Sequence, residues 1–167
     1  DTISETVDYL NANGRKVGLV KVRLYRPFSV KHLVAAIPST VKKISVLDRT
    51  KEPGSIGEPL YLDVVAALRD TEFANVPVYT GRYGLGSKDT TPAQIIAVFK
   101  NTEKKRFTIG INDDVTNLSL ALDENPDTTP AGITSCKFWG LGGDGTVGAN
   151  KNSTKIIGDH TDKYIQA

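Results

Sequence analysis

A glycine-rich stretch near the C-terminal end has the spacing that points most directly to chemistry. Gly140, Gly142 and Gly145 stand in the order G-x-G-x-x-G within the run from Thr134 to Lys151. Glycine lets the backbone adopt positive φ and come close to a ligand. The residues before the glycines are β-prone and those after them favour a helix through Ile157, so the run predicts a strand, a tight turn and a helix.

A turn of this kind has the features of an anion site. The first turn of a helix leaves backbone N–H groups unpaired, and the helix dipole favours negative charge there. We therefore expect the amides from Gly143 to Thr146, assisted by the Thr146 hydroxyl and Lys151, to face a phosphate. Asp144 would repel that phosphate unless it caps the helix. The predicted binding residues are Gly140, Gly142, Gly143, Asp144, Gly145, Thr146 and Lys151.

The same glycines also have a purely structural interpretation. Without side chains, they allow the helix to pack tightly on its strand. A dinucleotide site further requires an acidic residue about 20 positions on, at the end of the next strand. Asp159 and Asp162 lie near this distance along the chain, but no strand is predicted before them. A nicotinamide site therefore has little support. Anion binding and tight packing both stay open.

Other candidates for chemistry are weaker. Asp113 and Asp114 follow a predicted strand and point apart on alternation, which is typical of turn residues rather than of a metal or acid–base pair. Ser, His and Asp residues show no arrangement for nucleophilic catalysis, so no catalytic residue is predicted. Cys136 is the single cysteine. It is predicted to be buried, and alone it cannot hold an iron–sulfur cluster or a structural zinc, which take about four ligands.

The composition bounds the class of protein. The 21 basic and 19 acidic residues give a net charge of +2, which makes no electrostatic case for nucleic acid or an anionic membrane. No apolar run approaches the ~18 residues of a membrane span. We therefore expect a cytoplasmic protein without nucleic-acid or membrane partners. Methionine is absent and the chain opens with Asp1, which suggests a piece cut from a longer polypeptide.

Apolar periodicity predicts alternating helices and strands along most of the chain. Helices are predicted at 2–13, 30–37, 60–68 and 92–99, and strands at 17–25, 44–48, 76–80 and 107–111. Short connections between alternating strands and helices predict a parallel sheet with right-handed crossovers. The predicted fold class is therefore α/β, an open and mainly parallel sheet with helices on both faces. The first strand–helix unit of a second α/β domain follows.

Several stretches resemble an internal segment of the pyruvate:ferredoxin (or flavodoxin) oxidoreductases, also called pyruvate synthases. They occur in the family's order at 17–28, 46–54, 81–85, 108–116 and 140–153. The resemblance implies that residues 1–132 form an α/β domain similar to the transketolase C-terminal domain, lacking its first strand. It also implies that residues 133–167 begin a coenzyme-A-binding-like domain and leave it incomplete.

The resemblance implies a function as well. Family members oxidatively decarboxylate pyruvate with coenzyme A to acetyl-CoA and CO2, and pass electrons to ferredoxin or flavodoxin. For the whole enzyme it implies thiamine diphosphate, Mg2+, [4Fe-4S] clusters and a homo-oligomer. This segment is expected to supply scaffold to the enzyme's remaining domains and part of the coenzyme A site, and to be inert alone with unprotected sheet edges. The alternative is a stand-alone nucleotide-binding or subunit-docking α/β module without catalysis.

Overall fold

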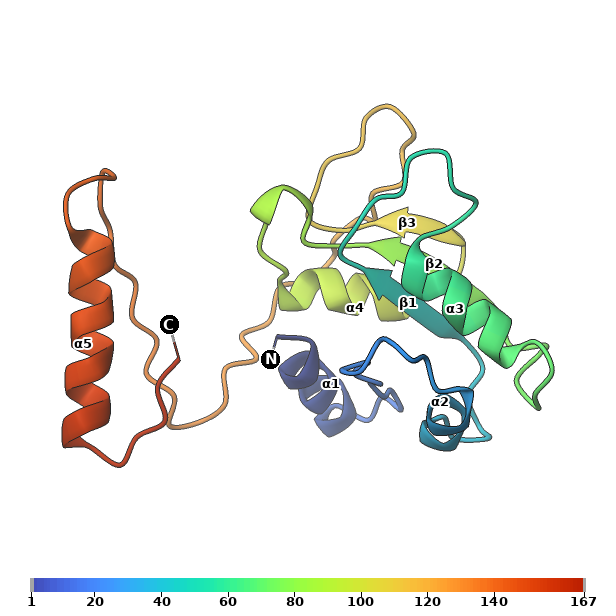
Figure 1. Ribbon diagram of the computed structural model, residues 1–167, viewed down its shortest axis with the longest axis horizontal. Helices are drawn as coiled ribbons and strands as arrows, with labels where there is room; N and C mark the ends of the chain where they lie inside the picture. Colours follow the sequence, from blue (N-terminus) through green and yellow to red (C-terminus); the bar gives the residue numbers. More distant parts are fainter. Residues whose placement is uncertain (1, 167) are drawn as a thin grey trace. The chain divides into compact units, whose positions relative to one another are not determined.

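Three parallel strands lie at the centre of the first part of the chain in the computed structural model, which describes residues 2–166. Their order in the sheet is β1 (Ile44–Asp48), β2 (Val78–Arg82) and β3 (Arg106–Thr108), as Figure 1 shows. Ile44 lies opposite Val78, and Thr80 lies opposite Arg106. The crossovers run through α3 (Pro59–Leu68) and α4 (Pro92–Lys100). The predicted parallel α/β sheet is therefore confirmed.

Helices cover both faces of this sheet. On one face, α2 (Val30–Ala36) and α3 pack with β1, and on the other α4 packs with β2 and β3 while α1 (Thr2–Ala12) packs against α4. Side chains alternate across a strand, so Val46 points to the first face and Leu47 to the second. The first cluster contains Leu33, Val46, Val64, Ala67, Leu68 and Phe73. The second contains Tyr79, Ile95, Val98, Phe107 and Ile109.

Local sequence signals explain where most helices begin. The Ser29 hydroxyl accepts a hydrogen bond from the His32 amide at the start of α2. Thr91 and Gln94 form a reciprocal capping box at the start of α4. Pro59 occupies the first turn of α3, where its missing N–H costs nothing. These starts agree with those predicted from the sequence.

Two predicted strands are wrong. Residues 17–25 form no regular secondary structure, and Leu24 is 72% exposed. Residues 134–139 before the glycine turn are also irregular, and Cys136 is exposed rather than buried. A strand forms only when a neighbour takes its backbone hydrogen bonds. Within residues 2–166 neither segment has such a neighbour, so the predicted second strand–helix unit is present only as its helix.

The last two strands of the sheet differ in extent from the prediction. β2 begins two residues later than expected and includes Gly81, which was assigned to a loop. A Cβ built on Gly81 would lie 2.3 Å from the Phe107 ring, so glycine is required there by packing. β3 stops at Thr108 because Gly110, at φ 83°, turns the chain soon afterwards.

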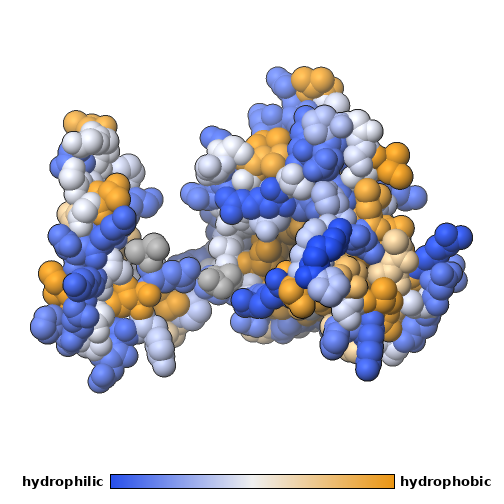
Figure 2. Space-filling model, viewed as in Figure 1, coloured by the Kyte–Doolittle hydropathy of each residue, from blue (hydrophilic) through white to orange (hydrophobic). Residues whose placement is uncertain are grey.

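The chain divides after Pro130 into two compact units. The sequence placed a domain boundary two residues later, and the family assignment of each unit stays a prediction. The second unit contains α5 (Thr146–His160), which has no buried residue among those described. Figure 2 shows apolar atoms at the surface of this unit between polar side chains. No helix in the described part of the chain is long and apolar enough to cross a membrane.

Candidate functional site

The glycine turn directly precedes α5, as the sequence predicted. Gly142, Gly143 and Gly145 have φ values of 86°, 67° and 84°, a region that favours glycine. A Cβ built on any of these three would meet nothing within 4 Å, so they border open space. The residue that caps the helix is Gly145, and not Asp144.

Asp144 closes the turn with its side chain. Its carboxylate accepts hydrogen bonds from the Leu141 amide at 2.8 Å and the Thr146 amide at 3.0 Å. The Thr146 hydroxyl also donates to it, at 2.6 Å. The hydroxyl and these amides lower the pKa of Asp144 to about 2. The protein's own carboxylate therefore occupies the Thr146 donors that the sequence predicted for a phosphate.

Gly140 has a different role from the other glycines. A Cβ at this position would lie 2.2 Å from the Thr146 hydroxyl oxygen and 2.7 Å from a carboxylate oxygen of Asp144. The missing side chain at Gly140 thus makes room for the hydrogen bonds that close the turn. Its place in the G-x-G-x-x-G pattern is explained by packing within the turn itself.

Two kinds of predicted donor stay available at the turn. The amides of Gly143 and Gly145 make no hydrogen bond to another residue of the described chain. Lys151 is exposed on α5, and within residues 2–166 it forms no ion pair. The structure thus brings Gly140, Asp144 and Thr146 together, and leaves Lys151 without a hydrogen bond to them.

A second polar cluster, which sequence reasoning missed, lies at the carboxyl ends of β1 and β2. Asp48 is 5% exposed, and its carboxylate accepts from the Leu60 amide at 2.9 Å and the Tyr61 amide at 3.1 Å. Burial raises the pKa of Asp48, and these two hydrogen bonds oppose that shift. Asp48 therefore caps the first turn of α3 from the preceding strand.

Glu58 completes this cluster. It is 3% exposed and accepts from the Glu52 amide at 2.8 Å and from the Arg82 guanidinium. Ligands in open α/β sheets bind at the carboxyl ends of the strands. Here the two buried carboxylates at that edge already accept hydrogen bonds from the chain's own amides and from Arg82. One signal was readable: Pro59 starts a helix after a residue that is a poor N-cap, so the cap had to come from elsewhere.

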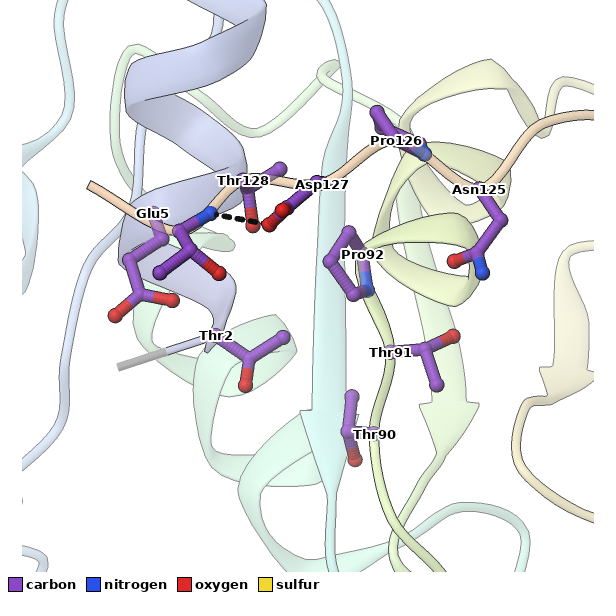
Figure 3. Close-up of a pocket in the computed structure, with 10 residues that line it drawn as sticks. Thr2, Glu5, Thr90, Thr91, Pro92, Asn125, Pro126, Asp127 and Thr128 are labelled. Carbon is purple, nitrogen blue, oxygen red and sulfur yellow. Dashed lines mark hydrogen bonds between the residues drawn. The ribbon is translucent and has the colours of Figure 1, made fainter. Parts of the chain in front are cut away.

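A cavity of the first unit lies between the start of α1, the start of α4 and residues 125–129. It has a volume of about 380 Å³ and is lined by Thr2, Glu5, Thr90, Thr91, Pro92, Asn125, Pro126, Asp127, Thr128 and Thr129. Figure 3 shows its hydroxyls and carboxylates, with a dashed line to the Asp127 carboxylate. This carboxylate accepts a hydrogen bond from the Thr129 amide at 2.9 Å. Its lining contains carboxylates and no Lys or Arg, so it is unsuited to anionic ligands. The described residues also include no group of three metal-ligating side chains.

Comparison with known proteins decides the family. A family model described as pyruvate:ferredoxin oxidoreductase core domain II matches residues 1–95. The pyruvate:ferredoxin oxidoreductase of Moorella thermoacetica is 59% identical over 170 residues, which cover 99% of this chain and 14% of that protein. The chain belongs to the pyruvate:ferredoxin oxidoreductase family. The predicted resemblance is confirmed, and the stand-alone module is not favoured.

Further members of the pyruvate:ferredoxin oxidoreductase family align equally far along the chain. The pyruvate-flavodoxin oxidoreductase of Enterobacter agglomerans is 59% identical over 100% of this chain and 15% of its own length. A mitochondrial NADP(+)-type pyruvate dehydrogenase of Euglena gracilis is 51% identical over 99% of this chain and 10% of its own length. The chain thus spans a small part of its relatives. The core domain II match ends at residue 95, before the glycine turn.

Proposed function

We propose that this chain is part of an enzyme that oxidatively decarboxylates pyruvate with coenzyme A to acetyl-CoA and CO2, passing electrons to ferredoxin or flavodoxin. The observation that carries the proposal is 59% identity over nearly the whole chain to oxidoreductases named for these two acceptors. A relative named for NADP(+) is 51% identical over the same residues. Residues of this chain are therefore shared among enzymes named for different acceptors.

Within that enzyme, the role of the first unit is scaffolding. Its buried carboxylates, Asp48 and Glu58, are held by amides and Arg82 and are not available for acid–base work. Iron–sulfur clusters take about four ligands each, and the chain has a single cysteine. In this proposal other domains hold thiamine diphosphate, Mg2+ and the iron–sulfur clusters. Purified residues 1–167 with pyruvate, coenzyme A and an electron-accepting dye should show no turnover, and turnover would contradict the scaffold role.

The second unit is proposed to contribute to the coenzyme A site. Coenzyme A supplies the thiol that accepts the acetyl group, and its phosphates need positive partners. The available amides of Gly143 and Gly145, followed by Lys151 on α5, are donors of the required kind. A phosphate that reached Thr146 would have to displace the Asp144 carboxylate, which holds that amide and hydroxyl. Asp144 therefore competes with the ligand in this proposal.

A pair of matched variants of the full-length enzyme tests the coenzyme A role. Gly145→Val places a side chain at a positive-φ position in the turn, and Gly132→Val does the same outside it. We expect Gly145→Val alone to raise the KM for coenzyme A. Asp144→Asn removes the competing charge and should lower that KM. Stable variants with unchanged KM would instead favour tight packing as the reason for the glycines.

The resemblance also predicts one further strand in the sheet, beside β1. Among the described strands β1 is an edge of the sheet, so one side of its backbone has no strand partner. An added strand would give the β1 edge its missing partners. We propose that the longer polypeptide supplies this strand. Amides of β1 should then exchange hydrogen more slowly in the full-length enzyme than in residues 1–167, and equal rates would count against it.

A further inference from the structure

A lysine ammonium closes the C-terminal end of α4. Lys43, the residue before β1, donates hydrogen bonds to the carbonyl oxygens of Phe99 at 2.8 Å, Asn101 at 2.6 Å and Val98 at 3.3 Å. An ammonium has three N–H donors and no acceptor, so these three bonds use it fully. The carbonyls lie more than 50 residues further along the chain, so the fold brings this lysine to them.

The carbonyls at this end of α4 need a positive partner. The last turn of a helix leaves its C=O groups without donors inside the helix, and the helix dipole makes that end negative. Lys100 lies in this turn, but its ammonium pairs with the carboxylates of Asp123 and Glu124. Lys43 therefore supplies the positive charge from outside the helix.

The Lys43 ammonium is held by neutral groups. The centroid of the Tyr79 ring lies 5.6 Å from Nζ, within the range of a cation–π contact. The Tyr79 hydroxyl donates to the Thr102 carbonyl at 2.9 Å, which holds the chain just beyond the three carbonyls. No Asp or Glu of the described chain forms an ion pair with Lys43. Burial lowers the pKa of Lys43, because its ammonium is partly removed from water.

We propose that the end of α4 is a binding site for one monovalent cation, and that the Lys43 ammonium fills it as a tethered ligand. Backbone carbonyls converging on one point are the ligands with which K+ channels replace the hydration shell of the ion. A free NH4+ also offers the hydrogen-bond donors that Lys43 supplies. With the lysine side chain removed, the site takes K+ or NH4+ from solution. This inference does not depend on the assignment to pyruvate oxidation.

The filled site positions the connection between α4 and β3. Asn101, whose carbonyl binds Lys43, donates from its side chain to the Lys104 carbonyl at 2.8 Å. The carbonyl of the following residue, Lys105, accepts from the Thr80 amide of β2 at 2.9 Å. Loss of the cation should therefore loosen residues 98–105 and have less effect on α3, which lies on the other face of the sheet.

Two simpler roles for Lys43 predict a different response to salts. If Lys43 only packs its methylene stem against its neighbours, a small cation in solution cannot replace it. If water satisfies the carbonyls equally well, removal of the side chain leaves the end of α4 unchanged. A cation site is the one case in which the end of the helix loosens and is then restored by K+ or NH4+.

Hydrogen exchange of the full-length enzyme, followed by mass spectrometry, tests the site in peptides that cover residues 98–105. Lys43→Ala should make these amides exchange roughly tenfold faster than in the parent enzyme. Peptides from α3 report whether the variant is folded. Lys42→Ala is the matched control, because Lys42 is the exposed neighbour and its loss changes net charge equally. Unchanged exchange in Lys43→Ala, or an equal rise in the control, would overturn the proposal.

A second variant separates the charge of Lys43 from its packing. Lys43→Met keeps an unbranched stem of similar length and removes the ammonium. Residues 98–105 should exchange as fast in Lys43→Met as in Lys43→Ala, because both leave the carbonyls without a cation. Protection retained in Lys43→Met would show that the stem alone holds the end of α4, which contradicts the proposal.

Rescue by salts then identifies the ligand. At a constant ionic strength of about 0.2 M, KCl or NH4Cl should slow the exchange of residues 98–105 in Lys43→Ala by roughly threefold or more. Tetramethylammonium chloride should not, because its methyl groups cover the charge and offer no donor. The parent enzyme, whose site is filled, should respond equally to all three salts. Equal slowing of Lys43→Ala by tetramethylammonium, or no slowing by either K+ or NH4+, would overturn the proposal.

Discussion

Both units of the molecule hold the start of a helix with an aspartate, but in opposite surroundings. Asp48 is buried and reaches α3 from the preceding strand, twelve residues away along the chain at Leu60. Asp144 is exposed and bonds only Leu141 and Thr146, three and two residues away along the chain. Burial raises the pKa of Asp48, whereas local hydrogen bonds lower that of Asp144. The first unit thus depends on tertiary structure, and the second on local sequence.

The largest expected difference between the two aspartates is in the stability lost when each carboxylate is removed. Asp48→Ala leaves the Leu60 and Tyr61 amides without their acceptor inside the fold, so we expect the free energy of unfolding to fall by about 2–3 kcal/mol. Urea denaturation followed by circular dichroism measures this. Asp144→Ala is the control, and it should leave the midpoint of the first unit unchanged. Similar midpoints for the two variants would show that burial does not separate the two aspartates.

Glycine substitutions should give a smaller effect with the same contrast. Gly81→Ala forces a Cβ to within 2.3 Å of the Phe107 ring, and such overpacking costs about 1–3 kcal/mol of stability. Gly18→Ala is the matched control, because its Cβ would meet nothing within 4 Å. Its stability should stay within about 0.5 kcal/mol of the parent chain. Thermal unfolding of both variants decides the matter, and a stable Gly81→Ala protein would refute the packing role of this glycine.

The pH dependence should differ in sign between the two aspartates. The pKa of Asp144 is lowered from 3.8 to about 2, so its contribution to stability is present above 3.8 and lost as pH falls towards 2. The pKa of Asp48 is raised, so its charging weakens the fold as pH rises above 3.8. Carboxyl carbon shifts in an NMR titration report both midpoints. Asp48 should titrate at the higher pH, and coinciding midpoints would remove the contrast.

Local signals account for the features that the sequence predicted well. The helix at Pro92 follows from Thr91 and Gln94, which contact each other within one turn. β1 was assigned with its observed bounds, because a short apolar run covered on both faces has few alternatives. The turn at Gly142, Gly143 and Gly145 was also predicted from residue type alone. In each case the residues that determine the structure are neighbours in the chain.

Long-range partners account for the failures. The strand predicted at 17–25 has the right alternation, but a strand also needs a neighbour, and a single sequence does not show whether one is present. Asp48 and Glu58 were missed as a cluster because their partners lie in another element or across the sheet. At the glycine turn, Asp144 was expected to repel a phosphate or to cap the helix. It instead takes the place of the anion by bonding Thr146.

The absence of buried residues in α5 makes its helical state conditional. A helix of 15 residues is about the length at which isolated helices are only marginally populated in water, because nucleation is costly. Contacts that cover α5 therefore shift a helix–coil equilibrium, and ordering its first turn also fixes the direction of the amides at Gly145 and Thr146. If the proposed coenzyme A phosphate binds at this turn, contacts on α5 and the affinity for that phosphate are linked thermodynamically, so that each one increases the other.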